Sequence, residues 1–327
     1  PPAHLAARRD AVRVIRREVV PEAMAGERLD RVVAMITGLS RSEVAALVAA
    51  GEVRVDGAAV TTRSQRVAAG MEVEVDAPVR SGPAPLEAEA AVPLVVVHED
   101  AHLLVIDKPA GLVVHPGAGQ PSGTLVHGLL AAYPEVRGVG PDPTRPGVVH
   151  RLDKGTSGLL LVARTQEAYE ALVSALAARE VHRRYRALVW GGFDAPRGLI
   201  DAPIGRSTRE PTRMAVDERG KEARTRYEVL RRFVEPVEVT ELACTLETGR
   251  THQIRVHLRS IGHAVVGDAR YDGNRQSLPM DRPFLHAEVL ELAHPVSGAP
   301  LAFHAALPAD LEAVLDGLTE AVEAADP

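Results

Sequence analysis

The chain has 327 residues, of which 46% are hydrophobic and 25% are charged. This composition excludes a wholly disordered or fibrous chain, and the length suggests roughly two domains. No apolar run approaches the ~20 residues that a membrane-spanning helix needs. The first residues lack the pattern of a secretion signal, so we expect a cytoplasmic protein with no membrane partner. Cys244 is the single cysteine, which excludes an intramolecular disulfide and a thiolate zinc cluster.

The formal net charge of −6 argues against a nucleic-acid partner, but the charges are unevenly distributed along the chain. Residues 145–275 carry 23 basic and 17 acidic side chains, whereas residues 276–327 carry one basic and nine acidic side chains. A basic central block can present a phosphate-binding surface in a protein that is acidic overall. The arginine and alanine enrichment of a GC-rich genome explains the same composition, so both interpretations stay open.

Residues 21–76 have the pattern of a small α/β domain, preceded by an arginine-rich extension over residues 1–20 that leads into a short strand near Val12–Arg17. Apolar residues recur at helical spacing from Glu27 to Met35. Ser40 is expected to cap a second helix, because a glutamate follows it three residues later. Val53 and Val55 alternate with a polar residue before Asp56-Gly57, which predicts a hairpin turn, and alternating valines near residue 75 predict another strand that ends the domain.

A proline-, alanine- and glutamate-rich segment over residues 77–91 is interpreted as a linker to a larger domain over residues 92–327. Because strands dominate there and helices are scattered among them, we expect an α+β fold with a mixed, mostly antiparallel sheet. The expected strands are Leu94–Val97, Leu103–Ile106, Gly158–Ala163, Tyr185–Trp190, Ala223–Leu230 and Val237–Leu246. The expected helices are Thr124–Ala132, Gln166–Arg179, His252–Ile261 and Ala309–Leu318.

The densest group of polar residues lies at 150–158, between two apolar segments that would hold such a loop rigidly. Its carboxylate, Asp153, is flanked by Arg151 and Lys154, whose charges favour the ionised form. An ionised and desolvated carboxylate suits nucleophilic attack. A salt-bridge cluster in a turn explains the same residues, and from the residues alone this structural interpretation is slightly preferred.

A second polar group spans residues 248–259. A helix capped by Thr251 would present Arg255 on one face, as a partner for an ionised carboxylate elsewhere. His252 and His257 would lie on different faces of that helix, and no carboxylate is spaced to complete a zinc motif, so we expect no metal site. Hydrogen bonds to backbone or phosphate groups account for both histidines equally well.

A third group lies at 179–191. In a strand, Arg183 and Tyr185 would share one face with apolar residues. A tyrosine there can stack on a nucleobase or take part in proton transfer, although a half-buried structural tyrosine shows the same pattern. The glycine patterns of dinucleotide and phosphate loops do not occur, so we expect no nucleotide cofactor.

These groups occur in the order of the motifs of one family, and the chain resembles the RluA-type pseudouridine synthases over roughly residues 94–307. Residues 27–75 resemble a small RNA-binding domain that a small-subunit ribosomal protein also contains. The segments that carry the resemblance of the larger domain are Lys108–Pro116, His150-Arg151-Leu152-Asp153, Thr156-Ser157-Gly158, Arg183-x-Tyr185-x-Ala187, Gly249–His257 and Gly267-Asp268.

The resemblance implies an isomerase that detaches a uracil through a ring nitrogen and reattaches it through a ring carbon, without a metal or organic cofactor. Asp153 would be the catalytic aspartate, and Arg255 would orient it through an ion pair. Tyr185 would contact the flipped uracil and remove a proton. The implied partner is large-subunit ribosomal RNA or an assembling ribosomal particle. The residues expected to bind RNA are Arg151, Ser40, Arg41, Arg54, Arg183, Arg250 and His252.

Two other hypotheses remain: an RNA-binding ribosome-assembly factor with a vestigial active site, and a hydrolase with a carboxylate nucleophile. The joint presence of Asp153, Tyr185 and Arg255 weighs against the first hypothesis. No second catalytic carboxylate is spaced nearby, which weighs against the second. Arg183 stands where the family usually has lysine, which keeps the charge but changes the geometry. The N-terminal extension and acidic tail lie outside the resemblance, and a monomer is the default expectation.

Overall fold

The computed structural model describes residues 13–39, 41–78, 86–117 and 119–321. The chain divides into two compact units, Pro1–Ala84 and Pro85–Pro327. Within the described residues, no helix has the length and apolar character needed to cross a membrane.

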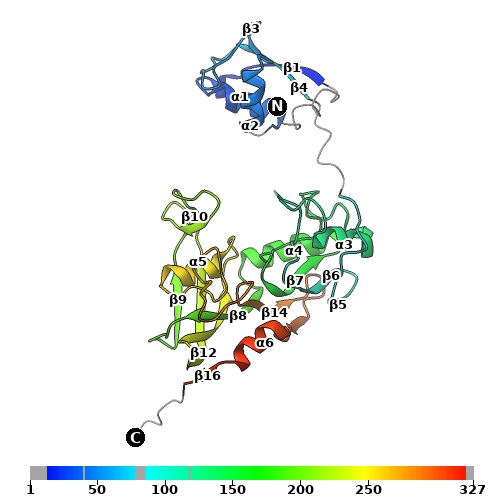
Figure 1. Ribbon diagram of the computed structural model, residues 1–327. Helices are drawn as coiled ribbons and strands as arrows, with labels where there is room; N and C mark the ends of the chain where they lie inside the picture. The colour runs from blue at the N-terminus through cyan, green and yellow to red at the C-terminus, as the bar shows by residue number, and fades with distance from the viewer. Residues whose placement is uncertain (1–12, 40, 79–85, 118, 322–327) are drawn as a thin grey trace. The chain divides into compact units, whose positions relative to one another are not determined.

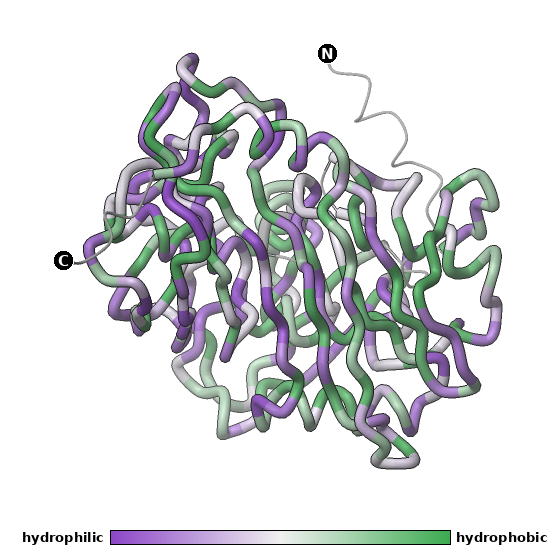
Figure 2. Tube along the Cα trace, turned by 90° about the horizontal axis from the view of Figure 1, so that it is seen from below, coloured by the Kyte–Doolittle hydropathy of each residue, from purple (hydrophilic) through white to green (hydrophobic). Residues whose placement is uncertain are grey.

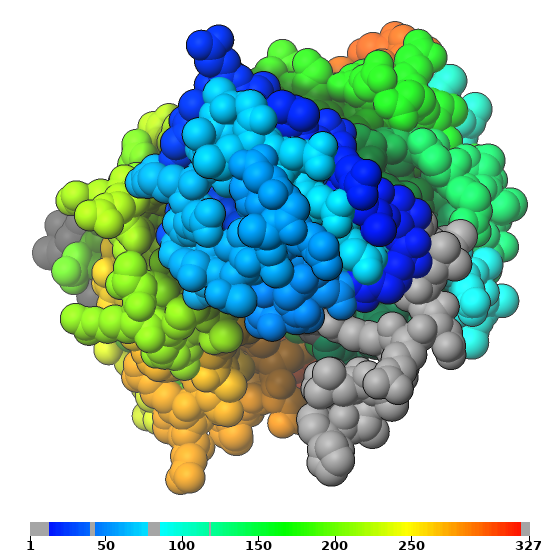
Figure 3. All heavy atoms as spheres, turned by 90° about the horizontal axis from the view of Figure 1, so that it is seen from above, coloured from blue at the N-terminus to red at the C-terminus, as the bar shows by residue number. Residues whose placement is uncertain are grey.

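The first unit is a small sheet with two helices packed on it, drawn in blue to cyan in Figures 1 and 3. Its four antiparallel strands follow the order β1-β4-β2-β3. Buried leucine and valine side chains from both helices and from β2 and β4 form its core. The elements are β1 (Arg13–Val19), η2 (Glu22–Met24), α1 (Leu29–Thr37), α2 (Arg41–Ala49), β2 (Val53–Val55), β3 (Ala58–Ala59) and β4 (Glu72–Pro78).

Strand β1 confirms the expected short strand but corrects the boundary of the extension over residues 1–20. Residues 13–19 pair with β4 along their whole length and so belong to the sheet. The Nε atoms of Arg13 and Arg17 donate to Asp76 at 3.1 Å and to Glu74 at 2.7 Å. All seven residues of β1 are exposed, so no buried face assigns this strand to the domain in the sequence. Ser40, the expected helix cap, lies outside the described residues.

The second unit is built on a ten-stranded mixed sheet in the order β16-β12-β13-β8-β14-β7-β6-β5, with β15 paired to β14 and β9 to β12. Strands β7 and β14 are parallel, and the other neighbours are antiparallel. The α+β fold with a mostly antiparallel sheet is therefore confirmed. The strands of the sheet are β5 (Val96–Glu99), β6 (Leu103–Lys108), β7 (Ser157–Ala163), β8 (His182–Trp190), β9 (Arg197–Asp201), β12 (Arg224–Glu235), β13 (Val239–Leu246), β14 (Leu285–Ala293), β15 (Pro300–His304) and β16 (Thr319–Glu320).

Helices cover both faces of this sheet. Helices α3 and α5 contribute to the same buried cluster as Leu160 of β7 and Tyr185 of β8, whereas α4 packs with Leu161 and α6 with Leu188. Figure 2 shows the strands side by side, with hydrophilic and hydrophobic residues along them. The remaining elements are α3 (Leu125–Ala132), η3 (Pro134–Val136), α4 (Gln166–Ala177), β10 (Ile204–Arg206), β11 (Met214–Val216), α5 (Gln253–Ser260) and α6 (Ala309–Asp316).

Strand β14 lies between β8 and β7, although the sequence pattern did not predict it. Two buried polar residues, His286 and Glu288, interrupt its apolar residues. His286 Nδ1 lies 2.9 Å from the hydroxyl of Ser157, and Glu288 forms ion pairs with Arg184 and Arg186 of β8. Cross-strand partners thus stabilise polar residues whose burial the local sequence does not reveal.

Gly158 joins β7 to β14 and lies in the predicted Thr156-Ser157-Gly158 motif. It pairs with Ala287 of β14 and has a φ of 106°. A Cβ atom at this position would lie 2.2 Å from the carbonyl oxygen of Ala287. Glycine is therefore required by both the backbone conformation and the close approach of the two strands.

We predict that Gly158→Ala lowers the free energy of unfolding by about 3 kcal/mol or more, because it adds a clash to a strained conformation. Gly298→Ala is the control, since Gly298 also has a positive φ, 72°, but no atom within 4 Å of an added Cβ. That variant should lose only about 1–2 kcal/mol. Urea unfolding measures both values, and equal losses would contradict the argument.

Candidate active site

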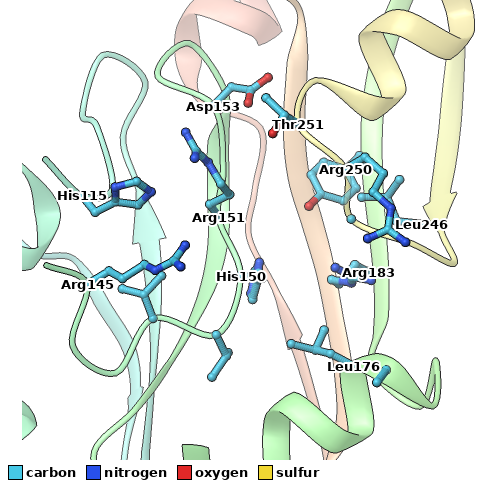
Figure 4. A pocket seen from close by; sticks show the side chains of 15 residues that line it. His115, Arg145, His150, Arg151, Asp153, Leu176, Arg183, Leu246, Arg250 and Thr251 are labelled. Carbon is cyan, nitrogen blue, oxygen red and sulfur yellow. The ribbon is translucent and has the colours of Figure 1, made fainter. Parts of the chain in front are cut away.

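A cavity of about 350 Å³ in the second unit brings the three predicted polar groups together. Figure 4 shows Asp153 at one end, His115 and Arg145 on one side, and Arg183 and Arg250 on the other. Asp153 is the one carboxylate among the described residues that line it. The full lining is His115, Arg145, Val148, Val149, His150, Arg151, Asp153, Leu176, Ala177, Arg183, Tyr185, Leu246, Gly249, Arg250 and Thr251.

Asp153 forms its ion pair with Arg255 of α5 and not with its sequence neighbours Arg151 and Lys154. Nη1 of Arg255 donates to Oδ2 of Asp153 at 2.8 Å. A local salt-bridge cluster in a turn, which the sequence slightly favoured, is therefore wrong. The loop that contains Asp153 therefore places this carboxylate at the edge of a basic cavity, in contact with a helix more than 100 residues later in the sequence.

A second carboxylate holds Arg255 in place. Nε and Nη2 of Arg255 donate to the two oxygens of Asp268 at 2.6 and 2.8 Å. Asp268 also accepts hydrogen bonds from the backbone N–H groups of Arg270 and Tyr271. Burial lowers the pKa of Arg255, but the hydrogen bonds and charges of Asp268 and Asp153 outweigh burial and raise it. The guanidinium thus stays charged and fixed beside Asp153.

Asp268 was given no role in the sequence interpretation. In the sequence, Asp268 could be noticed only because it belongs to the Gly267-Asp268 segment of the family resemblance. That segment does not indicate which residue pairs with Asp268. Its side chain is almost completely buried. A buried carboxylate requires a cation, and the structure identifies that cation as Arg255.

Tyr185 lies in the cavity wall on β8 and is 5% exposed. Burial raises the pKa of its hydroxyl, the charge of Arg183 opposes this rise, and the charge of Asp153 adds to it. The phenol is therefore protonated at neutral pH. Beside it on the adjacent strand, Cys244 of β13 is its registered neighbour and is fully buried.

Lys108 stabilises the turn after β6, and this turn contacts the Asp153 loop. Its fully buried Nζ donates to the carbonyl oxygens of Pro109 at 2.8 Å and Leu112 at 2.9 Å. Burial lowers the pKa of this amine to about 8. The backbone N–H of Gly111 donates to the carbonyl of Lys154 at 2.7 Å, which completes the connection.

The expected RNA-binding residues fall into two groups. Arg151, Arg183 and Arg250 line the cavity. His252, and not Thr251, is the N-cap of α5, with a φ of 58°. Its Nδ1 lies 2.7 Å from the hydroxyl of Tyr271, and its Nε2 lies 3.9 Å from Oδ1 of Asp153.

The remaining expected RNA-binding residues belong to the first unit. Arg54 is exposed on β2, with its Nε 4.0 Å from Glu74. Arg41 is the first residue of α2, but its side chain, like the whole of Ser40, lies outside what the structure describes. Among the described residues, no three histidine, cysteine, aspartate or glutamate side chains are grouped to hold a metal ion.

Two family models match the chain: "RNA pseudouridylate synthase" over residues 102–260 and "S4 domain" over residues 27–73. Proteins named ribosomal large subunit pseudouridine synthase D from Xanthomonas campestris and Nitrosomonas europaea are 44% and 46% identical to it. The alignments cover 94% and 91% of this chain and 93% and 86% of those relatives. An uncharacterized RNA pseudouridine synthase of Chloroflexus aurantiacus is 47% identical over 92% of this chain and 93% of that relative.

Solved structures are also similar. The structure of human RNA Pseudouridylate Synthase Domain Containing 1 matches with a TM-score of 0.56 and 26% identity, covering 73% of this chain and 94% of that chain. These relatives match nearly the full length of the chain, so the similarity extends over both units. The chain therefore belongs to the RNA pseudouridine synthase family, whose members are isomerases.

Proposed function

We propose that this protein flips specific uridines out of large-subunit ribosomal RNA and isomerises them to pseudouridine. The observation that carries this proposal is the carboxylate of Asp153, held 2.8 Å from Arg255 at the end of a cavity lined by four arginines. The names of the curated relatives support the choice of RNA. The S4 match supports RNA binding by the first unit, with Arg54, Arg41 and Ser40 as its contacts.

Asp153 attacks the nucleoside in this proposal. Its second oxygen is not engaged by Arg255, so the carboxylate is oriented by one oxygen and able to react through the other. The uracil bond through a ring nitrogen breaks and a bond through a ring carbon forms. No electron is gained or lost overall, because the carbon releases a proton and the nitrogen takes one up. The reaction therefore needs no redox cofactor.

Tyr185 contacts the flipped uracil and removes the proton from the ring carbon. Its place in the cavity wall beside Asp153 supports this role. Because burial keeps the phenol protonated, proton removal requires the phenolate. The neighbouring Arg183 guanidinium favours that form by its charge.

Arg151 holds the base out of the stack. It lies next to Leu152 and Asp153 in the loop and lines the cavity. A flipped base leaves a gap in the helix and costs a few kcal/mol of unstacking. The cationic side chain of Arg151 can offset part of this cost by attracting the phosphates of the RNA backbone.

Asp153→Asn should abolish pseudouridine formation on unmodified large-subunit ribosomal RNA and leave RNA binding intact, because only the charge of the carboxylate is removed. Asp272→Asn is the control, since Asp272 is an exposed aspartate paired with Arg259. Chemical mapping of pseudouridines measures the outcome and identifies the sites. RNA binding without modification by the wild type, on free RNA and on assembling particles, would support the assembly-factor hypothesis instead.

Asp268→Asn should lower kcat by about 100-fold with little change in KM, because Arg255 would no longer hold Asp153 in its reactive position. Asp268 is a positioning residue in this interpretation, so RNA affinity is expected to stay constant. Steady-state kinetics below the melting temperature of the variant gives both constants. A change confined to KM would contradict the role.

Tyr185→Phe separates contact with the base from proton removal. It keeps the ring but loses the hydroxyl, so we expect a 10²–10⁴-fold lower kcat at unchanged RNA affinity, whereas Tyr185→Ala should weaken both. Because burial raises the pKa of Tyr185, the kcat of the wild type should rise with pH from neutral into the alkaline range. A Tyr185→Phe variant with wild-type kcat would eliminate the proton-removal role.

A further inference from the structure

Arg183 has a buried charge with no counter-charge. Its side chain lies on the cavity face of β8, and the residue is only 6% exposed. None of the hydrogen bonds and ion pairs among the described residues involves its guanidinium, and its Nε is buried without a partner. Burial lowers the pKa of Arg183, which reflects the cost of this unpaired cation.

His150 presents a second unused donor beside Arg183. Its Nε2 accepts a hydrogen bond from the backbone N–H of Leu161 at 3.0 Å, so the proton of the neutral ring resides on Nδ1. Burial and the charge of Arg183 lower the pKa of His150 to about 3, which keeps the ring neutral. The Nδ1 atom is itself buried and has no partner among the described residues.

The cavity of about 350 Å³ leaves space for a ligand beside these donors. Gly249 packs against the guanidinium, and a Cβ atom there would lie 3.1 Å from Nη1 of Arg183. Further cations, Arg145, Arg151 and Arg250, line the same cavity, whereas its carboxylate, Asp153, is already paired with Arg255. The missing group must therefore accept hydrogen bonds and carry negative charge.

We propose that Arg183 and His150 form a preformed site for one RNA backbone phosphate next to the flipped uridine. The inference rests on the proposed function and extends it. Residues 183 and 185 are two positions apart on β8, about 6–7 Å, which leaves room for the base at Tyr185 and the phosphate at Arg183. A guanidinium offers a forked pair of donors to phosphate, which a lysine in its place would not.

Arg183 is expected to affect protein stability and RNA affinity in opposite directions. An unpaired buried cation destabilises the protein without RNA, and the phosphate compensates it in the complex. Arg183→Gln should therefore melt at the same temperature as the wild type or higher, but bind RNA about tenfold more weakly. The slope of log affinity against log salt should fall by about one.

Three variants accompany this test. His150→Gln keeps an acceptor for the N–H of Leu161 but loses the Nδ1 donor, so it should weaken RNA binding without changing the salt slope. Arg184→Gln is the matched control, because Arg184 lies on the opposite face of β8, is 49% exposed and is paired with Glu288. That variant should leave RNA affinity and salt slope unchanged. Arg183→Lys should bind RNA with intermediate affinity and a wild-type slope.

The experiment uses the full chain carrying Asp153→Asn, so that unmodified large-subunit ribosomal RNA is bound without turnover. Weaker binding of Arg183→Gln with an unchanged salt slope would mean a neutral acceptor such as a base carbonyl, and would overturn the phosphate site. Wild-type affinity of Arg183→Gln, or a clear loss of melting temperature, would also overturn it. Pseudouridine formation by the chain with Asp153 intact, on the same RNA, tests the proposed function separately.

Discussion

The bridge from Asp268 through Arg255 to Asp153 is the interaction on which the site depends. A buried guanidinium is tolerable only when its donors are satisfied, and here three of its nitrogens donate to two carboxylates at 2.6 to 2.8 Å. Asp268 is fixed by backbone N–H groups, so the position of Arg255 is set before substrate arrives. The hydrogen bond from Arg255 in turn fixes the position of the Asp153 carboxylate. The site therefore needs no rearrangement of charge to orient its carboxylate.

The sheet provides the rigidity that this bridge requires. The loop that contains Asp153 leads directly into β7, which is buried throughout and paired to β6 and β14 on its two sides. Lys108 stabilises the turn after β6 through the carbonyl oxygens of Pro109 and Leu112, and Gly111 of that turn donates to Lys154 of the same loop. On β8, side chains alternate between an ion-paired face, with Arg184 and Arg186, and the cavity face, with Arg183 and Tyr185. One strand thus supports folding on one side and substrate binding on the other.

Local patterns were sufficient for much of this architecture. Helical spacing located α3 to α6 to within about two residues, and the period of two placed Arg183 and Tyr185 together on one face of β8. The same patterns failed for β14, where partners from distant strands stabilise buried polar residues. They also failed for Asp268, because no local feature connects a carboxylate after one loop to a guanidinium 13 residues earlier. Pairings across the fold are what the sequence does not display.

Cys244 gives this sheet an internal chemical probe. It is fully buried at the centre of β13, opposite Tyr185, and burial raises the pKa of its thiol to about 12. A thiol in that state is inert to alkylating reagents until the strands separate. Because the chain has no other cysteine, the rate at which a reagent labels the protein reports the opening of the strand pair that carries Tyr185. Bound RNA that stabilises this strand pair would slow the labelling, so occupancy of the cavity becomes measurable from within the sheet without any turnover.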